Sequence, residues 1–120
     1  MNEPDQDFKV YIVSLILSKS TEEAIQILSK IYRVDVPKLG VGHIKGRKKA
    51  AGVYVSSKKT ILVSNGENLW DPFIILHEFY HHIRNEGGEQ RGNEKLADAF
   101  AHDYINAFKT QISHRTLFSP

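Results

Sequence analysis

The stretch "LHEFYHH", residues 76 to 82, places two histidines four positions apart, with a glutamate directly after the first. It lies within an apolar run that we predict to be a helix from Asp71 or Pro72 to about Arg84. Proline suits the first turn of a helix, and the glycines at positions 87 and 88 suit its end. The apolar positions of this helix predict a core-facing stripe: Phe73, Leu76, Tyr80 and Ile83.

His77 and His81 project from the same side of such a helix, because it has about 3.6 residues per turn. Their imidazole nitrogens can therefore be directed at one point, and Glu78 lies beside that point. In this HExxH pattern the histidines bind zinc and the glutamate acts as a general base. The pattern alone leaves a second interpretation open, in which His77, Glu78, His81 and the adjacent His82 are ordinary polar residues of an amphipathic helix.

A catalytic zinc site takes three protein ligands and keeps one position open, so a third ligand is needed. The stretch "NEKLADAF" at residues 93 to 100 carries Glu94 and Asp98 on one face of a second predicted helix, which runs from about Asn93 to Lys109. Glu94 can reach the metal, and Asp98 can accept a hydrogen bond from the outer N–H of His77. An alternative keeps the site but makes Asp98 the ligand in place of Glu94. The helix also carries an apolar stripe expected to pack on the histidine helix: Ala97, Ala101, Tyr104 and Phe108.

The remaining pattern predicts an α+β domain that spans residues 1–120. Apolar spacing predicts helices over residues 8–17 and 21–33, the second beginning with a capping box of Ser20 and Glu23. Three short β-type runs follow, at residues 39–44, 51–56 and 60–64, and we expect them to form a mostly antiparallel sheet. The basic turns at 45–49 and 58–59 are more often solvated hairpin tips than phosphate contacts.

Composition narrows the partners and the ligands. The chain has no cysteine, so only His, Asp and Glu can hold a metal. Sixteen basic and fourteen acidic residues give a net charge of +2, which makes a nucleic-acid partner an unlikely expectation. The acidic N-terminus and the short apolar run at 10–17 predict a soluble, cytoplasmic protein with no membrane partner.

The two motifs together resemble those of the gluzincin metallopeptidases, in which HExxH is followed by Glu-x-x-x-Asp. The run "EKLADAFA" is similar to the pattern of the membrane heat-shock and CAAX prenyl proteases and of soluble repressor-cleaving peptidases, and the resemblance covers about residues 51 to 108. It implies a minimal zincin-like domain with Zn²⁺ held by His77, His81 and Glu94. It also implies Glu78 as the general base and Asp98 as the partner of a ligand imidazole.

The chain departs from this family pattern at two points. Tyr80 stands where a small residue is usual, and its ring would either narrow the groove or fill the core. No residue is an obvious stabiliser of the oxyanion. The candidates, each more simply explained as an ordinary polar residue, are His102, Tyr54 and His114.

The expected activity is hydrolysis of peptide bonds in a peptide or protein substrate. Zinc would polarise the scissile carbonyl, and Glu78 would move a proton from water to the leaving amine. An extended substrate would pair with an exposed sheet edge, for which we expect the strand at 60–64. The tail at 110–120 would be long enough to fold over the site and keep the enzyme latent, or it would simply fray. The alternative function is a catalytically silent zinc-binding module that acts through protein or nucleic-acid contacts.

Overall fold

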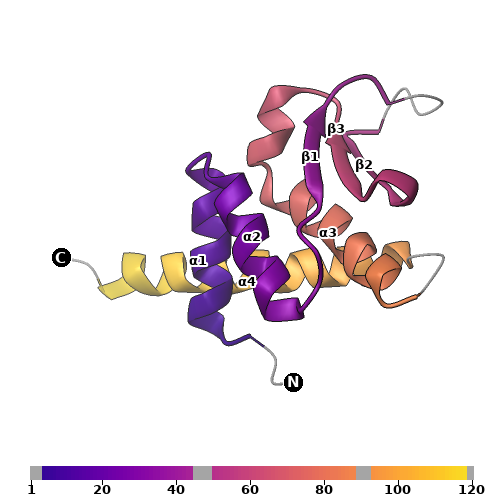
Figure 1. Cartoon of the computed structure of the whole chain (residues 1–120). Helices are drawn as coiled ribbons and strands as arrows, with labels where there is room; N and C mark the ends of the chain where they lie inside the picture. Colours follow the sequence, from indigo (N-terminus) through magenta and orange to yellow (C-terminus); the bar gives the residue numbers. More distant parts are fainter. Residues whose placement is uncertain (1–3, 45–49, 89–92, 119–120) are drawn as a thin grey trace.

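Four helices and a three-stranded sheet form the α+β fold in the computed structural model, which describes residues 4–44, 50–88 and 93–118 and side chains as far as residue 114 (Figure 1). The helices of these parts are α1 (Gln6–Leu17), α2 (Thr21–Tyr32), α3 (Pro72–Glu86) and α4 (Glu94–Phe118). The strands are β1 (Lys38–Val41), β2 (Gly52–Val55) and β3 (Thr60–Val63), with short 3₁₀ turns at η1 (Ser56–Lys58) and η2 (Gly66–Trp70).

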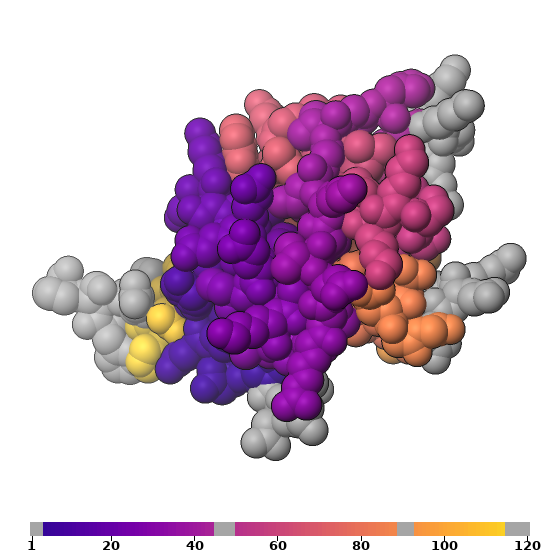
Figure 2. All heavy atoms as spheres, in the orientation of Figure 1, coloured from indigo at the N-terminus to yellow at the C-terminus, as the bar shows by residue number. Residues whose placement is uncertain are grey.

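Helix α3 is the central element, with the sheet on one side and the long helix α4 on the other (Figure 1). Helices α1 and α2 pack together across α4, and in the space-filling view they form one continuous surface with β1 (Figure 2). All of these elements share one core, and each fully buried Ile or Leu in it contributes about 1.5–3 kcal/mol. Its buried members are Ile12, Val13, Ile16, Ala24, Ile25, Leu28, Ile61, Val63, Ile75, Leu76, Phe79, Ala101 and Tyr104.

The sheet is mixed, with strand order β1–β3–β2. Strands β2 and β3 are antiparallel because only η1 and one further residue join them, whereas β1 and β3 are parallel. The prediction of a mostly antiparallel sheet was therefore wrong for one of the two strand pairs. The prediction that 60–64 supplies a free edge was also wrong, because β3 lies between the other two strands.

The predicted helices form, but their ends differ in detail. Ser20 precedes α2 without a side-chain capping bond, so the predicted capping box is not made, and the helix ends at Arg33 in a left-handed conformation (φ 58°). Asp71 caps α3 by accepting hydrogen bonds from the main-chain N–H groups of Phe73 and Ile74. Asn93 does the same for α4 through Leu96.

Helix α4 continues to Phe118, well beyond the predicted end at Lys109. At about 1.5 Å per residue, position 110 lies roughly 24 Å along the axis from Glu94. The segment 110–118 therefore extends away from α3 rather than folding over it (Figure 1). The geometry gives no support to the tail as a cover for the site, and residues 119–120 lie outside the described part. No helix in that part is both long and apolar enough to cross a bilayer.

Candidate metal centre

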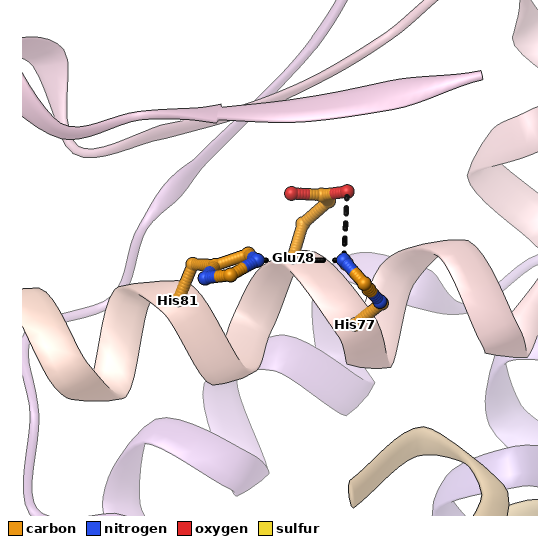
Figure 3. A group of neighbouring side chains, drawn as sticks. All are labelled: His77, Glu78 and His81. Atoms are coloured by element: carbon orange, nitrogen blue, oxygen red, sulfur yellow. Dashed lines mark hydrogen bonds and ion pairs between the residues drawn. The ribbon is translucent and has the colours of Figure 1, made fainter. Parts of the chain in front are cut away.

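Helix α3 carries His77, Glu78 and His81 close together, and Glu78 points toward a strand that passes above it (Figure 3). Glu78 is buried, and the two imidazoles are nearly so, each with 12 % of the side chain exposed. Atoms of the three side chains that are able to bind a metal lie within 4.8 Å of one another. Burial of polar groups is costly unless they are paired or bind a ligand. Three such groups close together in a largely buried position therefore indicate a binding site rather than solvated surface.

The core stripe of α3 differs from the predicted one. The fully buried core residues of the helix are Ile75, Leu76, Phe79 and His82. Phe73, Tyr80 and Ile83 are only partly buried and pack at the margin of the core. The prediction placed the stripe about one position too far round the helix, which left His82 outside it.

Helix α4 brings Glu94 and Asp98 to the histidines. The two carboxylate oxygens of Glu94 lie 2.9 Å from Nε2 of His77 and 2.8 Å from Nε2 of His81. Asp98 Oδ1 lies 2.8 Å from the other ring nitrogen of His77, Nδ1. Of the predicted apolar stripe of α4, Ala97, Ala101 and Tyr104 are buried, whereas Phe108 is only partly buried.

The hydrogen-bond donors and acceptors around His77 require a positive charge between this residue and Glu94. A carboxylate only accepts hydrogen bonds, so the contact with Asp98 takes a proton on Nδ1 of His77. Neutral imidazole then has a lone pair on Nε2, which faces Glu94 Oε2 at 2.9 Å. That contact is favourable only if His77 carries a second proton or if a cation lies between the two groups. Glu94 bridges the two rings while 74 % of its side chain is exposed, so an ion can enter from solvent.

The spacing of the two imidazoles fits a tetrahedral metal. Nε2 of His77 and Nε2 of His81 are 3.3 Å apart. Two nitrogens bound at about 2.0–2.1 Å to one tetrahedral zinc ion are about 3.3 Å apart. A carboxylate completes a common three-ligand set for catalytic zinc, so the residues present fit the ion.

The environment of His81 favours the neutral ring that a metal needs. Burial lowers the pKa of His81 below its ordinary value of 6.5, against the opposing effect of the Glu94 carboxylate. Desolvation disfavours the imidazolium because a charge is costly away from water. The Nε2 lone pair of His81 therefore stays available for a metal to a lower pH than in an exposed histidine.

Strand β2 lies directly above Glu78. A Cβ added at Gly52 would lie 2.7 Å from Cγ2 of Ile74 and 3.6 Å from Cγ of Glu78. Only a glycine allows the backbone of β2 to approach α3 so closely. The strand beside the candidate base is thus β2, which is also an edge strand, whereas the strand at 60–64, predicted to be the edge that pairs with substrate, is central.

The structure also contains a buried polar network that the sequence analysis missed. His82 is fully buried, its Nε2 donates to the carbonyl oxygen of Asp35 (2.6 Å) and its Nδ1 accepts from the hydroxyl of Tyr54 (2.7 Å). Asn85 donates to the same hydroxyl at 3.2 Å. Burial raises the pKa of Tyr54, which keeps the phenol protonated. The helical spacing of Ile75, Phe79 and His82 was a signal in the sequence for a buried histidine.

The structure places Tyr80 and the three residues that were candidates for stabilising the oxyanion. The ring of Tyr80 packs on Phe100 of α4, with centroids 5.5 Å apart, so it fills the interface between the helices. The Tyr54 hydroxyl is engaged with His82. His102 is exposed and its ring makes a tilted contact with that of Phe73, with centroids 5.0 Å apart, and His114 is exposed about three turns further along α4. The hydrogen bonds of Tyr54 and the ring contact of His102 are made with residues other than His77, Glu78 and His81.

Comparison with known proteins finds no matching family model and no significant match to a curated protein or a solved structure.

Proposed function

We propose that this chain is a zinc-dependent peptidase of gluzincin type, with a zincin-like fold, and that His77, His81 and Glu94 hold the ion. The proposal rests mainly on one observation, the convergence of both Nε2 atoms on the two oxygens of a single carboxylate from another helix. The alternative, in which the polar residues of α3 are ordinary surface residues of an amphipathic helix, does not explain why a carboxylate from α4 contacts both histidines. The order HExxH followed by Glu-x-x-x-Asp adds the family resemblance as support.

Zinc in this position would supply a Lewis acid that polarises a carbonyl group and acidifies water. Glu78 is buried beside the ligand cluster, and its Oε2 lies 4.0 Å from Nε2 of His77, at the limit of an ion pair. In the proposed reaction Glu78 accepts a proton from the attacking water and delivers it to the leaving amine. Asp98 holds the proton of His77 on Nδ1 and so keeps Nε2 directed at the ion.

The proposed substrate is an extended peptide that pairs with the outer edge of β2. Ser64 donates its main-chain N–H to Ala51, so this pair is hydrogen-bonded across β2 and β3. Antiparallel pairs alternate between bonded and non-bonded, and the main-chain groups of Gly52 and Tyr54 therefore point away from β3. An extended peptide can bond to these groups and lie above Glu78.

Metal content and cleavage together test the proposal. Purified protein should bind one equivalent of zinc and cleave unfolded protein or mixed fluorogenic peptides in a chelator-sensitive way. Glu94→Gln should lose the zinc, whereas Glu22→Gln should not; Glu22 is a matched control because it also lies exposed in a first helical turn. Glu78→Gln should keep the zinc and lose activity by about 10²–10⁴-fold.

Three results would contradict the proposal in different ways. Full zinc content in Glu94→Gln combined with its loss in an Asp98→Ala variant would make Asp98 the ligand. Cleavage that survives in Glu78→Gln would remove the general base. Stoichiometric zinc without cleavage of any peptide would instead favour the silent zinc-binding module.

A further inference from the structure

His82 is the only histidine among the described residues that is fully buried, and the proposed reaction does not use it. Its two ring nitrogens contact two segments far apart in the sequence. Nε2 bonds to the carbonyl of Asp35 in the connection from α2 to β1, and Nδ1 bonds to the hydroxyl of Tyr54 on β2. An apolar side chain would fill the same volume, so the polar ring serves these bonds rather than the packing of the core.

The bond to Tyr54 acts on the strand that covers Glu78. Side chains alternate along a strand, so Gly52 and Tyr54 face the same way, toward α3. Gly52 approaches Ile74 and Glu78, and Tyr54 approaches His82. The strand is thus fixed to α3 on both sides of Glu78 along the helix. The close contact at Gly52 sets the minimum distance between β2 and α3. The hydrogen bond between Tyr54 and His82 prevents the strand from moving away from the helix.

The main chain of the same two residues forms the outer edge of β2 in the part of the sheet that the structure describes. Their N–H and C=O groups point away from β3, as derived above from the pairing of Ala51 with Ser64. Any tilt of Tyr54 relative to α3 therefore changes the height of this edge above Glu78. A displaced edge makes poorer main-chain hydrogen bonds to an extended peptide and so weakens its binding.

We infer that His82 is a positioning residue, which acts through Tyr54 to hold the edge of β2 at a fixed height above Glu78. This inference rests on the proposed peptidase function, since the edge is the place where the peptide binds. His82 itself touches neither the substrate nor the ligand cluster. Its role is to present the peptide to the site in one register.

The matched pair of variants is Tyr54→Phe and Tyr32→Phe. The first removes the hydroxyl that bonds to His82. The second removes a comparable hydroxyl bond, 2.6 Å to Tyr104, in the core between α2 and α4. Both should destabilise the fold to a similar degree, but only Tyr54→Phe should raise the KM for an extended peptide, by about fivefold, with kcat changed much less.

A second measurement does not depend on activity. Hydrogen exchange should become faster in Tyr54→Phe at the amides of Val53 and Val55 on β2, and stay slow in α1 and α4 after correction for global stability. Tyr32→Phe should show no such local effect. Among variants of the histidine, His82→Gln keeps an acceptor and a donor and should restore most of the protection of β2, whereas His82→Leu should not.

A wild-type KM or wild-type exchange of β2 in Tyr54→Phe would overturn the inference, and so would equal effects of Tyr54→Phe and Tyr32→Phe on KM. A wild-type protein that cleaves no peptide would overturn the proposed function instead. The exchange data would then still decide whether His82 holds the strand on α3.

Discussion

Nδ1 of His77 on α3 lies 2.8 Å from Oδ1 of Asp98 on α4. This contact joins the two helices and also determines which ring nitrogen of His77 carries a proton. With its Nδ1 engaged by Asp98, His77 presents Nε2 to the place where Glu94 and His81 meet. One hydrogen bond thus connects the packing of two helices with the chemistry of the candidate site.

Replacement of Asp98 by asparagine tests this connection. Asparagine can still contact the ring, but it removes the negative charge and weakens the preference for a proton on Nδ1. We expect the affinity for zinc to fall by about 10–100-fold, measured by competition with a chromophoric chelator. Asp103→Asn is the control, because Asp103 lies on the same helix and pairs with Lys9 instead. Equal affinities in the two variants would show that Asp98 does not support the ligand.

Gly52 should tolerate no side chain. In Gly52→Ala the new Cβ meets Ile74 at 2.7 Å, so either β2 or α3 must shift. We expect a loss of about 1–3 kcal/mol in the free energy of unfolding, measured with urea. Gly66→Ala is the matched control, because nothing lies within 4 Å of a Cβ at that position. A loss in Gly66→Ala as large as that in Gly52→Ala would argue against a close approach of β2 to α3.

Alkaline pH should weaken the attachment of β2 through Tyr54. Burial raises the pKa of this phenol above its ordinary value of 10.0, so the folded state holds the proton more tightly than the unfolded chain. The stabilisation is therefore complete below pH 10 and is lost as the pH rises through the folded pKa. The difference in unfolding free energy between wild type and Tyr54→Phe should be largest at about pH 9 and smaller at about pH 11. A difference that does not change with pH would contradict this assignment.

Much of the fold could be predicted because local signals and the tertiary structure agree. Asp71 and Pro72 begin α3, and Asn93 begins α4, so both helices with candidate ligands start close to where their capping residues predict. The helix over residues 21–33 was also correct, although the Ser20 capping bond is not made. The end of α4 was misjudged because "TQISHRTLF" has weak apolar periodicity, yet no proline or glycine interrupts the helix.

The sheet could be predicted only in part. Runs of β-branched residues indicate that strands exist, and the short connection at 56–59 makes β2 and β3 antiparallel. Strand order depends on how the longer connection from β1 crosses the sheet, which local sequence does not specify. For this reason the parallel pairing of β1 with β3, and the position of β2 as the edge above Glu78, were not foreseen.

The sequence by itself determined which residues can form the candidate site. Helical spacing places His77 and His81 on one face of one helix, and Glu94 and Asp98 on one face of another. These spacings do not depend on where the helices lie in the fold. Only the tertiary structure decided that the two pairs meet, because their contact depends on buried apolar side chains such as Ala97 and Ala101, which draw α4 onto α3. It also decided that His82 is bonded to Tyr54. That outcome follows from long-range packing, since the two residues lie 28 positions apart and no local pattern links them.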